Sequence, residues 1–157
     1  MKTVRVDLLL VLIAALLLAF VFLRPHHRRP PGVLASISLT PGVVNPDVSQ
    51  VTITSTICKE GWTRTIRPPT SYTNELKLRQ LREYGERGPP SAYQEDHLIS
   101  LELGGHPTDP RNLWPEPYPR ASEVDGMEND LNEQVCSGDL SLAEAQQRES
   151  VLKHTEG

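Results

Sequence analysis

The chain has 157 residues, a formal net charge of −4, and 14 prolines with few aromatic side chains. This length accommodates one domain of ordinary size plus an appendage, and the prolines indicate a loop-rich domain with a modest core. The acidic balance argues against a tight nucleic-acid-binding protein, because such proteins usually carry a basic excess, but it is compatible with a nuclease that has only a local basic face.

The first predicted element is an apolar segment from Leu8 to Leu23, which ends at Arg24. Its length lies between the apolar core of a signal peptide and a full membrane span of about 20 residues. A signal peptide usually ends in small residues, whereas Arg24 and Pro25 follow here, so we expect an uncleaved transmembrane anchor over residues 1–24. If the segment is cleaved instead, the protein is secreted.

A stretch rich in Pro, Gly and Ser follows the anchor and predicts a tether over residues 25–38. The folded domain is then expected over residues 39–157. Positively charged residues flank the apolar segment on both sides, so the positive-inside rule does not fix the orientation of the anchor. These charges therefore do not decide on which side of the membrane the domain lies.

The first part of the domain predicts a strand and a helix. Thr and Ser alternate with β-branched apolar residues over Val51–Ile57, which is a strand signal. A helix is expected over Asn74–Tyr84, with Ser71 or Thr73 as its candidate cap and Gly85 as its stop.

Two further helices are predicted in the last part of the chain. Apolar side chains recur at helical spacing over Ala121–Val135, although Gly126 weakens that pattern. The last helix is expected to start within Leu140–Gln146, where Ser141 and Glu144 have the spacing of a capping box.

The central motif spans Tyr93–Tyr118 and places an acid and a histidine side by side, at Asp96 and His97. A half-apolar run follows, ends at a glycine pair, and returns through a Pro- and Asp-rich loop as Arg111–Trp114. Two short extended segments joined by such a loop predict a hairpin. This hairpin places Asn112 on the return strand, near His97 on the outgoing one.

These residues resemble the HNH, or His-Me finger, nuclease motif, a ββα unit built around one divalent metal ion. The resembling positions are Asp96-His97, Gly104-Gly105, Asp109 and Asn112-Leu113. The chain is also similar to a family of bacterial secreted or membrane-tethered HNH-like proteins, through the stretches TPGVVNP, TICKEGWTRTIRPP, DHLISLELGG, DPRNLWPEP and VCSGDLSLAEAQ. The resemblance covers roughly residues 40–147. It implies an α+β fold, with a ββα-metal unit and flanking helices after an N-terminal transmembrane helix.

The resemblance implies hydrolysis of phosphodiester bonds, with nucleic acid as the substrate, and the residue types suit that chemistry. A histidine with a pKa of about 6.5 takes a proton from water at neutral pH, so His97 is the expected general base. Asp96 is the expected metal ligand, and the amide of Asn112 is expected to orient the His97 ring. Neighbouring side chains on a strand point to opposite faces, so Asp96 and His97 converge only at a strand end or a distortion.

The third metal ligand is where this sequence departs from the resembled motif, because no histidine occupies the start of the following helix. Glu116 is the nearest oxygen donor, and Asp125 and Glu128 are the alternatives. Oxygen ligands favour Mg²⁺ or Mn²⁺ over Zn²⁺. Three interpretations follow. The first is a metal-dependent endonuclease or phosphodiesterase, and the second is a catalytically inactive HNH-like module for binding or envelope association. The third is a small membrane-tethered structural protein in which the hairpin only builds the core.

Basic residues before the first predicted helix are candidates for phosphate contacts. Arg64 and Arg67 fit that role, whereas the basic residues of the helix itself fit a solvated face equally well. Asp109 and Trp114 have ordinary structural interpretations, as a turn former and as a core residue.

The two cysteines, Cys58 and Cys136, have no further partners at zinc-ligand spacing, so no zinc knuckle is predicted. Outside the cytoplasm the expected state is one disulfide, which closes a long loop and stabilises the fold by roughly 4 kcal/mol. Two buried free thiols are the alternative for a cytoplasmic domain. Together with the family resemblance, the cysteines favour an extracytoplasmic domain on a single-pass membrane anchor.

Overall fold

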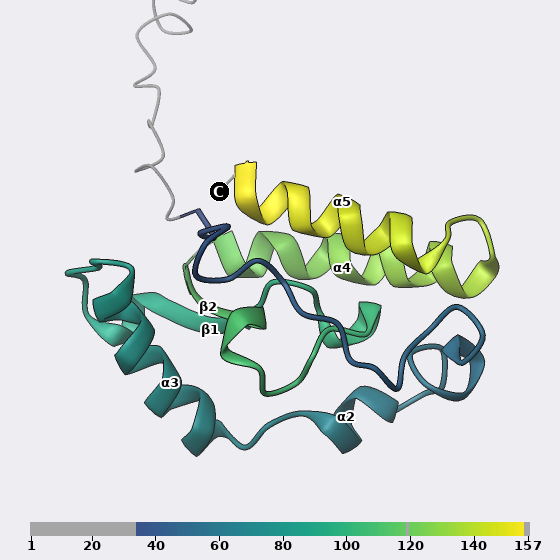
Figure 1. Ribbon diagram of the computed structural model, residues 1–157, viewed down its shortest axis with the longest axis horizontal. Coiled ribbons are helices and arrows are strands. Elements are labelled where there is room, and N and C mark those ends of the chain that lie inside the picture. Colours follow the sequence, from purple (N-terminus) through teal and green to yellow (C-terminus); the bar gives the residue numbers. More distant parts are fainter. Residues whose placement is uncertain (1–33, 119, 156–157) are drawn as a thin grey trace, which may run out of the picture. The chain divides into compact units, whose positions relative to one another are not determined.

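The computed structural model describes residues 34–118 and 120–155, which form a mixed α+β domain (Figure 1). The α+β class expected from the sequence is confirmed. The helices and strands are, in order, α2 (Trp62–Ile66), α3 (Thr70–Glu83), β1 (Tyr93–His97), β2 (Leu113–Pro117), α4 (Arg120–Ser137) and α5 (Leu142–Thr155). Short 3-10 turns lie between them at η1 (Ile53–Ser55), η2 (Pro90–Ala92), η3 (Leu101–Leu103) and η4 (Pro110–Asn112).

The predicted anchor over residues 1–24 and most of the predicted tether lie outside the described residues. Over the ranges 34–118 and 120–155, no helix has the length and apolar character that a membrane span needs. Ala35 and Ser36, at the end of the expected tether, are held against the domain. Ala35 is buried and its N–H donates to the carbonyl of Lys153, while the N–H of Ser36 donates to the Tyr84 hydroxyl.

The predicted hairpin is confirmed, because β1 and β2 pair antiparallel as a two-stranded sheet. The register places Asp96 opposite Trp114 and Gln94 opposite Glu116. β1 ends at His97, before the half-apolar run, since the Asn112 side chain hydrogen-bonds both the N–H and the carbonyl of Ile99. The chain therefore leaves the sheet immediately after the histidine.

The turn after η3 depends on glycine. Gly104 has a φ of +75°, in the left-handed region that side chains with a Cβ disfavour. Gly105 lies so close to the Ile99 carbonyl that a Cβ has no room there. The glycine pair therefore lets the loop fold back tightly enough for Asn112 to reach Ile99.

The predicted strand at Val51–Ile57 is wrong. The segment forms turns and η1, because its hydroxyl side chains bond to nearby carbonyls instead of leaving the backbone free for a sheet partner. The Thr52 hydroxyl donates to the Asp47 carbonyl at 3.0 Å, and the Thr56 hydroxyl donates to the Thr52 carbonyl at 2.7 Å.

The first predicted helix is confirmed as α3, but it begins at Thr70, earlier than expected. Ser71 and Thr73, the candidate caps, lie inside the helix, and the residue at its N-cap is Pro69, which provides no side-chain cap. Gly85 follows the helix with a φ of +73°, so it acts as the predicted stop.

The two later helices, α4 and α5, also match the prediction. The capping box at the start of α5 is present, because the N–H of Glu144 donates to the Ser141 hydroxyl and the N–H of Ser141 donates to the Glu144 carboxylate, each at 3.3 Å. Figure 1 shows α4 and α5 side by side on one side of the hairpin, with α3 on the other.

Two apolar clusters hold these elements together. The larger cluster joins η3, α4 and α5 and contains Val48, Ile57, Ile99, Leu103, Leu131, Val135, Leu140, Leu142 and Ala145. The smaller cluster surrounds Trp114, which is fully buried as predicted for a core residue. The disulfide between Cys58 and Cys136 is present, with 5.6 Å between the two Cα atoms, and Cys58 packs against the larger cluster.

Candidate functional site

A hollow of about 350 Å³ lies where the end of β1 meets α4. We call it the His97 hollow. Its lining residues are Arg67, Gln94, Asp96, His97, Ser100, Leu101, Glu102, Asp125, Glu128 and Asn129. Most of the predicted site residues therefore meet here, whereas Arg64, Asn112 and Glu116 do not line the hollow.

The His97 ring is held by the loop that follows its strand. Its Nε2 lies 3.1 Å from the carbonyl oxygen of Pro107, and a carbonyl only accepts, so Nε2 carries the proton. Burial lowers the pKa of His97 below its usual 6.5, so the ring is neutral at pH 7. In this tautomer Nδ1 keeps its lone pair, and no described residue hydrogen-bonds to it.

Asn112 does not orient this ring, contrary to the role expected from the sequence. Its side-chain amide instead hydrogen-bonds the loop backbone. It accepts from the N–H groups of Ile99 and Val43 and donates to the carbonyls of Ile99 and His106. Asn112 is fully buried and fixes the loop that carries Pro107. Its effect on His97 is therefore indirect, through the backbone.

Asp96 and His97 reach the same hollow although they are neighbours on a strand. The condition stated from the sequence is met, because His97 is the last residue of β1 and the chain turns directly after it. A second hollow of about 280 Å³ extends this site toward the start of α3, and it shares Arg67, Gln94, Asp96 and His97 with the first.

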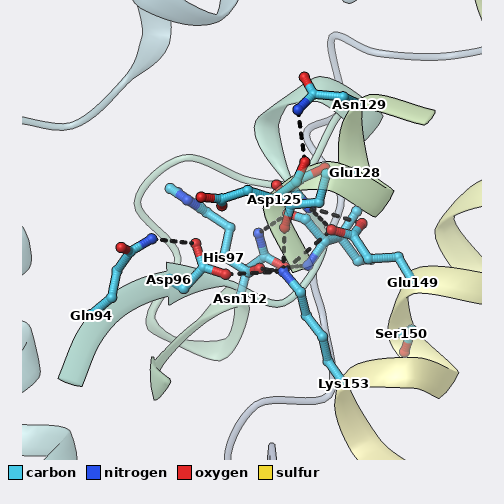
Figure 2. A network of polar contacts seen from close by, with 12 residues as sticks. Gln94, Asp96, His97, Asn112, Asp125, Glu128, Asn129, Glu149, Ser150 and Lys153 are labelled. Carbon is cyan, nitrogen blue, oxygen red and sulfur yellow. Dashed lines mark hydrogen bonds and ion pairs between the residues drawn. The ribbon is translucent and has the colours of Figure 1, made fainter. Parts of the chain in front are cut away.

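A buried ammonium group lies among the carboxylates of this site (Figure 2). The Nζ of Lys153, on the last turns of α5, donates to Asp96 Oδ2 at 3.0 Å, to Glu128 Oε1 at 2.7 Å and to the His97 carbonyl at 2.6 Å. Glu149 Oε1 lies 3.3 Å away. The Lys153 side chain is fully buried, so this cation belongs to the interior of the protein.

Asp96 and Lys153 keep each other charged. Burial alone would raise the pKa of Asp96, but the Lys153 ammonium brings it down to about 2. Burial alone would lower the pKa of Lys153, but the charges of Asp96, Glu149 and Glu128 raise it well above 10.5. At neutral pH the site therefore contains a carboxylate and an ammonium in direct contact.

The remaining carboxyl groups of the cluster hold protons more tightly than usual. Burial raises the pKa of Glu128 to about 8, and burial together with the Asp96 charge raises that of Glu116 to about 9. Burial also raises the pKa of Glu149. Glu116 is fully buried, and neither of its carboxyl oxygens has a hydrogen-bond partner among the described residues.

Sequence reasoning missed Lys153 and Glu149. A Glu–Lys pair at this spacing usually lies on an exposed helix face, where it contributes little. The buried residues of α5 are Leu142, Ala145, Glu149 and Lys153. This helical spacing was the available signal, because the apolar stripe that starts the helix continues directly into the two charged residues.

The side chains at this site partly fit the divalent ion predicted from the sequence. Asp96, Asp125 and Glu128 line the same hollow, and their oxygen atoms suit Mg²⁺ or Mn²⁺. Glu116 suits this role less well, since it does not line the hollow. Within the described ranges, no three acidic, His or Cys side chains converge closely enough, as they stand, to hold a metal.

No family model, curated protein or solved structure matches this chain. Its function is therefore inferred from the residues that line the His97 hollow. They combine a neutral histidine with a free ring nitrogen, an ionised aspartate, further carboxyl groups on α4, and an arginine on the facing side.

Proposed function

We propose that this domain is a metal-dependent endonuclease or phosphodiesterase whose HNH-like ββα site consists of β1, β2 and α4. One observation carries the proposal: the His97 ring is fixed through Nε2 by the Pro107 carbonyl and keeps Nδ1 free in a hollow lined by carboxylates and an arginine. A positioned, neutral imidazole beside an anion-binding group is what proton abstraction from an attacking water requires.

The protein side chains divide the reaction between them. His97 Nδ1 takes the proton from the water molecule, while the Pro107 carbonyl holds the ring in the tautomer that leaves this nitrogen free. Arg67, exposed at the edge of the hollow, contacts the phosphate and offsets part of its charge. The Asp96 carboxylate stays ionised because of Lys153, so it remains available as a ligand or as a hydrogen-bond acceptor.

Asp96 and Glu128 are the residues that would hold a divalent ion, with Asp125 as a further oxygen donor on α4. A bound ion supplies charge neutralisation for the phosphate and for the leaving oxygen. The donor set favours Mg²⁺ or Mn²⁺ over Zn²⁺.

The disulfide supports an extracytoplasmic location for this activity. Such bonds persist in oxidising compartments and are rare in the cytoplasm, and Cys58 and Cys136 are bonded here. With the apolar segment at the N-terminus, we propose a membrane-tethered enzyme whose domain acts outside the cytoplasm on nucleic acid.

The test is cleavage of supercoiled plasmid by the full chain, purified oxidised in mild detergent, with Mg²⁺, Mn²⁺, Ca²⁺, Zn²⁺ or a chelator. We expect nicking with Mg²⁺ or Mn²⁺ that falls at least about 100-fold in His97→Gln. Glutamine offers the Pro107 carbonyl an N–H donor but has no basic nitrogen, so the variant separates catalysis from loop structure.

The matched control is His106→Asn in the same loop. The Nδ1 of His106 accepts from the N–H groups of Thr108 and Asp109, and an asparagine oxygen accepts in the same way, so cleavage should persist. Equal nicking by wild type and His97→Gln would contradict the proposal. So would intact plasmid, single-stranded DNA and RNA with every metal.

The second candidate function is a catalytically inactive binding module. Lys153 favours it, because its ammonium already contacts the two carboxylates that a metal ion would need. This candidate predicts nucleic-acid binding without cleavage, unchanged by the metals and by His97→Gln. Gel-shift assays run beside the nicking assay separate the two functions.

A further inference from the structure

Lys153 contacts the carboxylates that line the functional hollow. Its Nζ lies 3.0 Å from Asp96 Oδ2 and 2.7 Å from Glu128 Oε1, and both residues face the His97 hollow. The same ammonium donates to the carbonyl of His97 itself. The Lys153 ammonium therefore lies between Asp96 and Glu128, the two proposed metal ligands.

An ammonium and a divalent ion cannot share these oxygen atoms. Mg²⁺ binds carboxylate oxygens at about 2.0–2.1 Å, so an ion between Asp96 and Glu128 would lie in the space of the Lys153 Nζ or directly against it. Two cations at that separation repel strongly in a buried site. Occupancy by one therefore excludes occupancy by the other.

The cluster contains more carboxyl oxygens than the Lys153 ammonium contacts. Asp96, Glu128 and Glu149 contact Lys153, and Glu116 lies buried beside Asp96 with both carboxyl oxygens unpartnered among the described residues. Unsatisfied buried carboxyl groups are costly. These oxygen atoms are the ligands that a divalent cation such as Mg²⁺ prefers.

We propose that the Lys153 ammonium and a divalent cation are alternative occupants of the Asp96–Glu128 carboxylate pair, so that Lys153 blocks metal binding until it withdraws. This inference deepens the proposed function, since it rests on the same site and describes its regulation. Withdrawal requires a new side-chain rotamer of Lys153 or the loosening of the last turn of α5. The chain itself thus provides the inhibitor of its metal site.

The test measures Mn²⁺ binding to the full chain in detergent, without nucleic acid, from the paramagnetic resonance signal of free Mn²⁺. Lys153→Met removes the charge and keeps an unbranched side chain of similar length. We expect Lys153→Met to bind Mn²⁺ at least about tenfold more tightly than the wild type. The substitution removes the repulsion between the ammonium and the ion, and a tenfold change in affinity needs only a small part of that repulsion.

A double variant assigns the site. Adding Glu128→Gln to Lys153→Met should cancel the gain in Mn²⁺ affinity, whereas adding Glu133→Gln, an exposed glutamate on the same helix, should preserve it. Equal Mn²⁺ affinity for the wild type and Lys153→Met overturns the proposal. A gain that survives Glu128→Gln overturns it as well.

Lys153→Met leaves buried carboxylates without their cation, so its stability is measured with and without Mn²⁺. If this variant folds only when Mn²⁺ is present, the ion has replaced the ammonium and the proposal is supported. If neither Mn²⁺ nor Mg²⁺ restores folding or raises the melting temperature, the proposal fails. The wild-type chain is the reference, and we expect Mn²⁺ to leave its melting temperature unchanged because Lys153 occupies the site.

These outcomes are independent of cleavage. A Lys153→Met chain that binds Mn²⁺ tightly but never nicks DNA supports the cation exchange and contradicts the nuclease. A chain that nicks DNA with Mn²⁺ affinity unaffected by Lys153→Met supports the nuclease and contradicts the cation exchange.

Discussion

The His97 hollow lies between two parts of the domain that differ in how they use their cations. We call them the basic wall, which is Arg67 with α2 and α3 beside it, and the acidic wall, which is α4 with α5 packed against it. On the side of α2 and α3, Arg67 is exposed and makes no ion pair with a described residue. On the side of α4 and α5, Lys153 is fully buried and contacts three carboxylates. The exposed guanidinium is available to an anionic ligand, whereas the buried ammonium serves the carboxylates of its own protein.

This difference shows why net charge is a poor guide to the site. The chain is acidic overall, but its acidic residues concentrate on α4, at Glu123, Asp125, Glu128, Asp130 and Glu133. Basic residues gather instead on α2, α3 and the loop between them, at Arg64, Arg67, Lys77, Arg79 and Arg82. A phosphate backbone is attracted to one wall and repelled by the other. The hollow therefore lies at a boundary between charges of opposite sign.

Breaking the covalent link between the walls should have the largest effect. The disulfide joins Cys58, just before α2, to Cys136 near the end of α4, across a sequence separation of 78. Replacing both cysteines by alanine should lower the free energy of unfolding by about 4 kcal/mol, because the unfolded chain regains its freedom. Urea denaturation measures this change. A loss below about 1 kcal/mol would show that the walls hold together without the bond.

The buried acid of β2, Glu116, should make stability depend on pH. Glu116 has a pKa of about 9 in the folded chain against 4.5 ordinarily, so the folded state keeps a proton that the unfolded state releases. Its contribution is fully present below pH 4.5 and is lost as the pH rises toward 9, by up to about 1.4 kcal/mol per pH unit.

Glu116→Gln tests this effect, because glutamine has the shape of the protonated acid but does not titrate. Its unfolding free energy should fall less steeply than that of the wild type between pH 5 and pH 9. Glu133→Gln, an exposed change on α4, is the control. Parallel curves for Glu116→Gln and the wild type would mean that Glu116 is already ionised near neutral pH.

The basic wall should govern substrate binding. Arg67→Ala should raise the KM for plasmid roughly tenfold and reduce the slope of binding against salt by about one. Arg64→Ala is the matched control, because Arg64 lies nearby but does not line the hollow. Equal effects of the two changes would show that the hollow does not guide the phosphate.

Surface charges away from the hollow should have the smallest effect. Asp130 and Glu133 are exposed on the outer part of α4, so Asp130→Asn with Glu133→Gln should raise nucleic-acid affinity about two- to threefold at low salt. The gain should disappear near 0.5 M salt, since screening removes long-range repulsion. An increase that persists at high salt would place these residues in direct contact with the ligand.

Local signals in the sequence were sufficient for much of the fold. The hairpin, α3, α4 and α5 were predicted because turn residues, a capping box and helical spacing act over a few neighbouring positions. The disulfide was predicted because the chain has only two cysteines, which leaves one possible pairing. Val51–Ile57 failed because the same Thr-rich alternation permits hydroxyl bonds to nearby carbonyls, and these prevailed. Strand pairing needs a distant partner that a pattern does not reveal.

The site was predicted only in part, for a related reason. Asp96 and His97 were identified from the motif. The partner of the His97 ring is the backbone carbonyl of Pro107, and because every residue has such a carbonyl, the sequence does not indicate which one the ring contacts. Lys153 and Glu149 look like a surface pair until the packing of α5 is known. Which face of a helix is buried depends on its neighbours, and here that face carries the charges of the site.

The chain at Ala35 is attached to the last turn of α5, so a force on this end of the domain acts on that helix. The N–H of Ala35 donates to the Lys153 carbonyl at 3.1 Å, and His154 Nε2 donates to the Thr40 carbonyl at 3.1 Å. Tension applied to the chain at Leu34 therefore loads the last turn of α5 first. That turn contains Lys153, so the residue whose backbone holds Ala35 is also the residue whose ammonium contacts Asp96 and Glu128.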